Sequence, residues 1–273
     1  MPRIPIDDLD DPRIAIYRSL KATNQTRGLD QFVVEGQRLV SRLLGSRFPV
    51  VSALITDRYE PKLAAEIPEA VPAYVVPHRL IDAVVGFPFH RGVLACGERR
   101  PWPPLTELVS DRDRRLCLVI CPKLSNPENL GALARIGDVF GIDAILAGPE
   151  CPDPLSRRVL RVSMGAVLRL PVIVADRLLE AAGGLSQAAG VELLAAVADP
   201  GAEPFENVPP PRRSGLVLGD EHEGIDPRWR ALCRRAVTIP MRPGASSLNV
   251  AVAAGILIYH FVRKDAHVGQ ALA

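Results

Sequence analysis

The chain has 273 residues, which at about 150 residues per domain corresponds to about two domains and excludes a single small disulfide-stapled module. Hydrophobic residues make up 48% and charged residues 23% of the sequence, a balance typical of globular rather than disordered proteins. The 33 basic and 31 acidic side chains nearly cancel, to a net charge of +2. Bulk charge therefore does not identify a nucleic-acid-binding protein.

The types of basic residue are more informative than the net charge. Only four of the basic residues are lysines, and the rest are arginines. Arginine suits bidentate contacts to phosphate, but a compositional bias of the genome explains the excess equally well. The five cysteines are scattered without Cys-x-x-Cys spacing, which favours reduced thiols and predicts neither a structural disulfide nor a zinc site. The five histidines do not cluster either, so we expect no metal.

The sequence predicts no membrane segment and no export signal. The N-terminus, MPRIPIDDLDD, is acidic where a secretory signal has a basic region followed by an apolar run. The longest apolar stretch, residues 250–259, is shorter than the roughly 18 residues of a membrane-spanning helix. We expect a cytoplasmic protein, and we interpret 250–259 as part of a buried helix.

The first third of the chain predicts a small α/β domain. Residues 1–29 form an N-terminal extension with helix-compatible spacing over 13–28, ending at Gly28 as the expected C-cap. Strands are predicted at 32–36, 51–57, 73–77 and 91–98, and helices at 37–45 and 78–86. These elements suffice for a domain over residues 30–98. The proline-rich, charged segment 99–114 is the predicted linker.

Residues 115–265 predict a second α/β domain, followed by a tail at 266–273. Its predicted strands are 116–121, 143–148, 170–175, 191–197, 215–220 and 236–240, with one helix from about residue 129 and another at the end. Continuous apolar strands of this kind predict a mostly parallel, buried sheet. Such sheets bind ligands at the carboxyl ends of their strands, so we expect the site in the loops after Cys121, Leu218 and Ile239.

The first of these loops, PKLSNPENLGALARIGD, runs into a helix. Gly131, Arg135 and Asp138 recur there at helical spacing, so Arg135 can face a bound ligand. A plain helix start fits the same residues, with Asn126 or Asn129 as the cap and an exposed pair of Arg135 and Asp138. The loop by itself leaves both interpretations open.

The second and third loops also allow two interpretations each. In GDEHEG, Ile225 follows the second glycine where a phosphate-binding loop has lysine, so that motif is excluded. Glu221 is either a ligand-orienting carboxylate or part of a strand-end turn. In PMRPGASSLNVAVAAG, Ser246 and Ser247 lie at a helix start, and Asn249 is the polar residue of an apolar helix. The side-chain amide of Asn249 needs hydrogen-bond partners. These are either nearby backbone groups or a bound substrate or cofactor.

Taken in order and spacing, NPENLGALARIGD, LVLGDEHEGI and IPMRPGASSLNVAVAAG resemble the three signature motifs of the SpoU/TrmH family of RNA ribose 2'-O-methyltransferases. FVVEGQRLV, HRGVLACGE and residues 154–172 also resemble this family, so the similarity spans about residues 30–263. The resemblance implies an α/β SPOUT fold with a C-terminal trefoil knot in the second domain. It further implies an RNA-binding first domain similar to ribosomal protein L30e, and a homodimer.

The resemblance also assigns residues. The active-site residues of the three motifs are matched by Asn129, Arg135, Glu221, Ser247 and Asn249. The positions expected to bind S-adenosylmethionine are Leu218, Gly219, Ile239, Met241, Ser247 and Leu248. The second motif departs from the family at Asp220 and His222, where Ser or Asn and Gly are more usual.

RNA contacts are expected from two basic stretches. His90 and Arg91 lie in the first domain, and Arg157, Arg158 and Arg161 belong to a stretch, 157–169, without an acidic residue. Both stretches can contact phosphates. The competing interpretation for each arginine is a solvated face or an ion pair between subunits.

The implied reaction transfers a methyl group from a sulfonium to a ribose 2'-hydroxyl and needs no metal. A guanidinium stays protonated in proteins and is a poor proton acceptor, so we expect Arg135 to bind the adjacent phosphate and to stabilise alkoxide charge. The proton acceptor stays unassigned. Ribosomal RNA is favoured over transfer RNA because the first domain resembles that of ribosomal RNA enzymes. Two competing hypotheses are a non-catalytic RNA-binding relative and a nucleotide-dependent oxidoreductase, whose GxGxxG fingerprint is missing.

Overall fold

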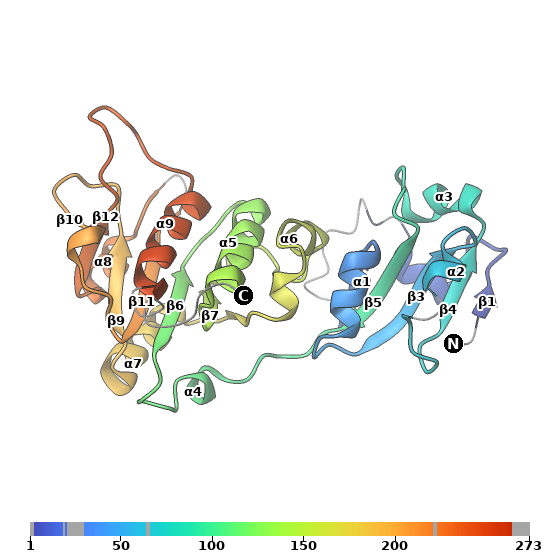
Figure 1. The fold of residues 1–273 in the computed structure, drawn as a ribbon, viewed down its shortest axis with the longest axis horizontal. Helices are drawn as coiled ribbons and strands as arrows, with labels where there is room; N and C mark the ends of the chain where they lie inside the picture. Colours follow the sequence, from blue (N-terminus) through green and yellow to red (C-terminus); the bar gives the residue numbers. More distant parts are fainter. Residues whose placement is uncertain (1–2, 19, 21–29, 64–65, 221–222, 264–273) are drawn as a thin grey trace, which may run out of the picture. The chain divides into compact units, whose positions relative to one another are not determined.

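The computed structural model describes residues 3–18, 20, 30–63, 66–220 and 223–263. The chain divides into two compact units, drawn in Figure 1: one comprises Met1–Pro101 and Asp153–Arg169, the other Trp102–Pro152 and Leu170–Ala273. Contacts thus group segment 153–169 with the first unit, whereas the sequence pattern groups it with the second. The chain passes between the two units three times.

The first unit contains a five-stranded mixed sheet in the order β1-β4-β3-β5-β2. Strand β5 is antiparallel to both its neighbours, and β1, β4 and β3 run parallel. The strands are β1 (Arg3–Pro5), β2 (Gln31–Glu35), β3 (Val50–Thr56), β4 (Ala73–Val76) and β5 (Val93–Glu98). The helices are η1 (Pro12–Tyr17), α1 (Gln37–Leu44), α2 (Glu60–Leu63), η3 (His78–Leu80), α3 (Ile81–Val85), α6 (Arg157–Val162) and η4 (Ala166–Leu168). The predicted small α/β fold is confirmed.

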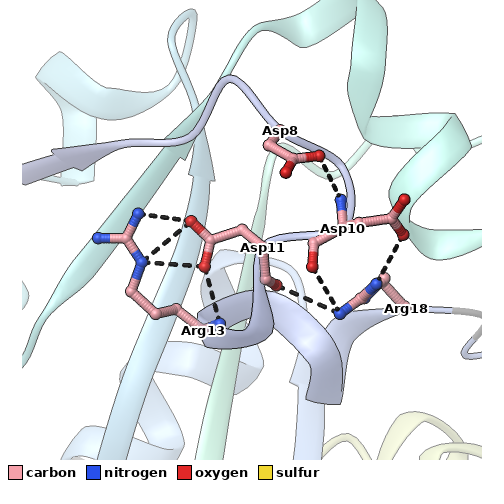
Figure 2. Close-up of polar contacts among 5 residues, drawn as sticks. All are labelled: Asp8, Asp10, Asp11, Arg13 and Arg18. Atoms are coloured by element: carbon pink, nitrogen blue, oxygen red, sulfur yellow. Dashed lines mark hydrogen bonds and ion pairs between the residues drawn. The ribbon is translucent and has the colours of Figure 1, made fainter.

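Of the helix predicted over 13–28, the described residues form a short 3-10 helix, η1, over Pro12–Tyr17, and residues 19 and 21–28, with the predicted C-cap Gly28, lie outside the described residues. Figure 2 shows how the acidic opening begins this helix: the Asp11 carboxylate accepts the backbone N–H of Arg13 at 2.8 Å and its Nε–H at 2.9 Å. The side-chain hydrogen bonds from Arg13 lower the pKa of Asp11 to about 2. The cap therefore stays ionised well below neutral pH, and its contribution to stability is lost only as the pH falls through that value.

The second unit contains a seven-stranded, all-parallel sheet in the order β10-β12-β9-β11-β6-β7-β8. Its strands are β6 (Leu116–Cys121), β7 (Ala144–Ala147), β8 (Val172–Val174), β9 (Glu192–Ala196), β10 (Glu203–Pro204), β11 (Arg213–Leu218) and β12 (Arg235–Thr238). Its helices are α4 (Leu105–Leu108), α5 (Pro127–Phe140), α7 (Leu178–Ala189), η5 (Phe205–Asn207), α8 (Pro227–Leu232) and α9 (Val250–Arg263). The predicted parallel sheet is confirmed. The trefoil knot stays a prediction, because strand order does not define how the chain is threaded.

Helices cover both faces of the parallel sheet. Alternate residues of β6, such as Leu118 and Ile120, pack in one apolar cluster with α7 and with Trp229 of α8. Helices α5 and α9 lie side by side, and α9 also packs against β11. Burial of both faces explains why these strands are continuous apolar runs in the sequence. In the described part of the chain, no helix is both long and apolar enough to cross a membrane.

Candidate functional site

The strands that carry the three motif loops end at one edge of the parallel sheet. β6 and β11 are neighbours, and β9 separates β11 from β12. A cavity of about 630 Å³, a volume typical of small-molecule sites, lies at this edge. Its lining residues are Ala196, Val197, Ala198, Asp199, Leu218, Gly219, Asp220, Gly224, Ile225, Val237, Ile239, Met241, Ser246, Ser247, Leu248, Asn249, Val250, Ala253 and Leu257. All six positions predicted to bind the cofactor are among them.

Gly219 is required by a close approach of two backbone segments. A Cβ atom at this position would lie 2.5 Å from the carbonyl carbon of Gly224 and 2.8 Å from the backbone nitrogen of Ile225. Asp220 and Gly224 exchange backbone hydrogen bonds of 2.9 and 3.0 Å, and Gly224 has φ of +73°. Asp220 and Gly224 are therefore paired as in a tight hairpin, and Glu221 and His222 lie outside the described residues. The role predicted for Glu221 stays a prediction.

Asp220, where the sequence departs from the family pattern, joins two of the loops. Its Oδ2 accepts a hydrogen bond of 3.2 Å from the Ser125 hydroxyl in the loop after β6. Its Oδ1 accepts the backbone N–H of Glu223 at 3.1 Å. The carboxylate thus holds the hairpin after β11 against the loop that precedes α5, a role that the sequence did not reveal.

Two asparagines join the first and third loops. Asn126 is the N-cap of α5, accepting the backbone N–H of Glu128 at 2.8 Å. This leaves the buried side chain of Asn129 to accept a hydrogen bond of 2.9 Å from Nδ2 of Asn249. Oδ1 of Asn249 accepts the N–H of Ala251 at 2.9 Å, so Asn249 also caps α9. The side-chain amide of Asn249 therefore forms hydrogen bonds both to the backbone of α9 and to Asn129 of the first motif.

Arg135 is exposed on α5, in the same helix as Asn129. It forms neither a hydrogen bond nor an ion pair within the described part of the chain, so the pairing with Asp138 that the sequence allowed is not observed. Its guanidinium is open to a ligand from outside the chain.

The cavity is acidic. Among its described lining residues, Asp199 and Asp220 are ionisable, and none is Lys, Arg or His. A cavity of this kind suits a cationic ligand and opposes a phosphorylated one. The loop 196–199 was not predicted to belong to the site. The available signal was Asp199, a carboxylate directly after a predicted strand.

The residues predicted to contact RNA have different surroundings within the first unit. His90 and Arg91 are exposed just before β5, and the Arg91 side chain packs against Gly36, which precedes α1. Arg158 and Arg161 are partly exposed on α6. Their RNA contacts stay predictions.

Arg157, by contrast, is engaged inside the first unit. Its guanidinium forms an ion pair with Glu35 of β2, donates a hydrogen bond to the Leu20 carbonyl, and stacks 4.8 Å from the centre of the Phe87 ring. The Arg157 side chain is 13% exposed and that of Glu35 is 7% exposed. These contacts fit the competing interpretation, in which an arginine of this stretch forms an ion pair. They leave an RNA contact of Arg157 without support.

Replacing Arg157 with alanine should therefore destabilise the first unit. Breaking a buried ion pair from one side leaves the Glu35 carboxylate buried without its partner, which costs about 3–5 kcal/mol. Denaturant unfolding of Arg157→Ala measures the loss. Arg161→Ala, on the same helix, is the matched control and should change the free energy of unfolding by no more than about 0.5 kcal/mol. Equal effects of the two substitutions would contradict the anchoring role.

The cysteine thiols of the protein are mostly buried. The five cysteines are reduced thiols, and burial raises the pKa of Cys96 to about 12 and the pKa values of Cys117 and Cys233 to about 11. These three thiols are therefore protonated and weakly nucleophilic at neutral pH. No group of three or more His, Cys, Asp or Glu residues that could hold a metal ion occurs within the described residues.

The fold and the cavity define an α/β protein with a cavity of small-molecule size at the strand ends of a parallel sheet. Comparisons with known proteins narrow this class. The model of the SpoU rRNA methylase family matches residues 117–259, which include all three motifs. A protein of Mycobacterium tuberculosis described as an uncharacterised tRNA/rRNA methyltransferase is 31% identical over 271 residues, covering 96% of this chain and 92% of its own length.

Two further proteins extend the comparison. The 23S rRNA (guanosine(2553)-2'-O)-methyltransferase of Bacillus subtilis is 25% identical, over 93% of this chain and 98% of its own. The crystal structure of an AdoMet-bound rRNA methyltransferase from Sinorhizobium meliloti superposes with a TM-score of 0.82 at 22% identity, over 98% of this chain and 99% of that one. This likeness shows a common fold across both units.

The chain belongs to the SpoU rRNA methylase family. It is an S-adenosylmethionine-dependent RNA 2'-O-methyltransferase of this family, which confirms the class and the cofactor predicted from the three motifs.

Proposed function

We propose that this enzyme methylates a ribose in ribosomal RNA. The observation that carries the proposal is the cavity itself, lined by the second and third motif loops and joined to the first motif by the hydrogen bond between Asn249, which lines it, and Asn129. The family match and the named activity of the Bacillus subtilis relative support ribosomal RNA as substrate. Transfer RNA is the second candidate, because the description of the Mycobacterium tuberculosis relative includes it.

The cavity residues fit S-adenosylmethionine. The cofactor supplies an electrophilic methyl group on a positively charged sulfur, and Asp199 and Asp220, the ionisable residues of the described lining, suit that charge. The backbone groups of Gly219, Ile239 and Leu248 offer the donors and acceptors that an adenine edge needs. Absence of a Cβ at Gly219 keeps the hairpin tight beside them.

The chain's own residues then position the RNA. Asn249, fixed by its bond to Asn129 and by capping α9, and Ser247 offer hydrogen-bonding groups at the cavity. Arg135 binds the phosphate next to the target ribose and stabilises the negative charge that develops on the 2'-oxygen as its proton leaves. Positioning of the two reacting groups contributes much of the rate of an in-line transfer.

RNA docking involves four basic residues of the first unit that are exposed or partly exposed. His90 and Arg91 lie together before β5, and Arg158 and Arg161 lie on α6. Contacts of this type are electrostatic and should weaken as salt rises. Such contacts suit a structured RNA, whose phosphate backbone the protein recognises by its shape.

We also propose a cytoplasmic homodimer. Thiols that are buried and protonated fit a reducing compartment. Helix α9 carries an exposed apolar stripe of Val252, Ile256 and Tyr259 at helical spacing, with Val139 of α5 also exposed. Monomeric proteins rarely leave such a stripe uncovered, and a second copy of the chain can bury it.

Val252→Asp should therefore weaken the dimer and the methyl-transfer rate together. Burial of a carboxylate in an apolar contact is unfavourable, and Val252 is 51% exposed in the single chain, so the folded monomer tolerates it. Sedimentation over a concentration series measures the association. Val174→Asp, at the edge strand β8, is the control and should leave both association and rate unchanged. A fully active wild-type monomer at dilution contradicts the proposal.

Two different functions fit less well. A nucleotide-dependent oxidoreductase needs cations or a glycine-rich turn for its phosphates, and the described lining residues include no cation. A non-catalytic relative would not need Arg135 open on α5. Incubation with radiolabelled S-adenosylmethionine and separated ribosomal and transfer RNA fractions tests the proposal. Label in ribosomal RNA supports it; label confined to transfer RNA selects the second candidate, and no label in either contradicts both.

A further inference from the structure

The loop after β9 brings an unassigned carboxylate into the cofactor cavity. Strand β9 is hydrogen-bonded to β11 on one side and to β12 on the other, the two strands that lead into the second and third motif loops. Ala196 ends β9, residues 197–199 follow it at the same edge of the sheet, and all four line the cavity. Asp199 thus lies between two cofactor-binding loops, and neither the motifs nor the family match assigns it a role.

The two carboxylates of the cavity differ in their hydrogen bonds. Both oxygens of Asp220 accept hydrogen bonds, from Ser125 and from Glu223. Asp199 is exposed, and its Oδ1 accepts the backbone N–H of Gly201 at 2.8 Å, which fixes the side chain in a turn. Its Oδ2 has no partner among the described residues. Asp199 therefore presents one oriented, unused acceptor to the cavity.

The order of the strands places Asp199 away from the end of the site where methyl transfer takes place. The reacting end is marked by Asn129 and Arg135 on α5, which follows β6, and β11 lies between β6 and β9. Asp199 is thus nearer to the part of the ligand that is remote from methyl transfer. An adenosyl cofactor offers a carboxylate three kinds of donor: the ribose hydroxyls, the exocyclic amine of adenine, and the ammonium of the methionine arm.

Charge and hydrogen-bonding patterns favour the hydroxyls. The adenine amine lies beside ring-nitrogen acceptors, which a carboxylate repels. The ammonium shares a carbon with a carboxylate of the cofactor, and the described lining residues provide no cation to offset the repulsion between that group and Asp199. The ribose diol carries two adjacent O–H donors and no charge. Acidic residues bind ribose hydroxyls in the same way in dinucleotide-binding sheets.

We propose that Asp199 binds the ribose diol of the adenosyl cofactor and so selects a ribonucleoside ligand. This inference rests on the assignment of S-adenosylmethionine to the cavity. Ligand binding measured without RNA distinguishes the cofactor site from the role of Asp199. If the wild-type protein does not bind S-adenosylhomocysteine, the cofactor site is wrong. If it binds normally and Asp199 has no effect, only the present inference is wrong.

The test is calorimetric titration with S-adenosylhomocysteine, its 2'-deoxy and 3'-deoxy analogues, and 5'-methylthioadenosine. Because hydrogen bonds to charged groups are strong, the wild-type protein should bind at least one deoxy analogue about 10- to 100-fold more weakly than the parent compound. Asp199→Ala should lose a similar factor for S-adenosylhomocysteine and lose most of the discrimination against that analogue. Asp199→Asn, which keeps an acceptor for the Gly201 turn, should show the same loss of discrimination.

Asp176→Ala is the matched control, because Asp176 also follows a strand at this edge, β8, but does not line the cavity. It should bind all four compounds like the wild-type protein. A loss in Asp199→Ala that is equal for parent and deoxy compounds overturns the inference. A loss that disappears with 5'-methylthioadenosine also overturns it, because the carboxylate then binds the ammonium.

Discussion

Replacing Arg135 with alanine is expected to slow single-turnover methyl transfer by about 100-fold or more, by analogy with the loss of one charge-stabilising donor in other enzymes. Affinity for S-adenosylhomocysteine should not change, because Arg135 does not line the cofactor cavity. Its guanidinium is exposed and forms no ion pair within the described residues, so the substitution removes no internal contact. Rapid-quench assays with saturating RNA measure the rate, and calorimetry measures the affinity.

Two further variants show which property of Arg135 matters. Arg135→Lys should recover little activity, since a point charge does not reproduce two donors in one plane. Arg230→Ala removes an exposed arginine from α8 in the same unit and should leave the rate unchanged. If Arg135→Ala methylates RNA at the wild-type rate, Arg135 is an ordinary surface residue and the proposed mechanism is wrong.

Gly219→Ala should abolish most cofactor binding. The added Cβ would lie 2.5 Å from the carbonyl carbon of Gly224, a backbone atom that moves only if the hairpin opens. The two backbone hydrogen bonds between Asp220 and Gly224 would then be lost. Overpacking costs about 1–3 kcal/mol, so we expect affinity for S-adenosylhomocysteine to fall about 10-fold or more by calorimetry.

Gly184→Ala is the control for this substitution. A Cβ at Gly184, inside α7, meets no atom within 4 Å. Alanine should therefore leave ligand binding intact and raise stability by up to about 1 kcal/mol, through its better helix propensity. Unchanged binding by Gly219→Ala would show that the hairpin is not part of the cofactor site.

The sequence was most informative where local pattern and burial agree. Apolar runs such as LCLVIC predicted β6 at its true bounds, because a strand buried on both faces has no polar positions. The predicted start of α5 was late by two residues: Asn126 caps the helix and Pro127 begins it. Over 13–28, apolar spacing predicted an ordinary helix where the described residues form the short 3-10 helix η1.

Contacts between distant residues could not be predicted. Asn129 and Asn249 are 120 positions apart, and the motifs identified both without showing that they bind each other. Arg157 was predicted to contact RNA, because nothing in the neighbouring sequence indicates its ion pair with Glu35, which is 122 positions away. The position of Asp199 at the cavity could not be predicted for a related reason. The order of the strands decides which loops lie next to each other, and the sequence does not show that β9 lies between β11 and β12.

Mass spectrometry of nucleosides from unmodified ribosomal RNA, incubated with the enzyme and S-adenosylmethionine, tests the central claim most directly. We predict a single new 2'-O-methylated nucleoside, formed by the wild-type protein and nearly absent with Arg135→Ala under the same conditions. A methyl group found on a base, or RNA left unmodified by a protein that binds S-adenosylhomocysteine, would contradict the account.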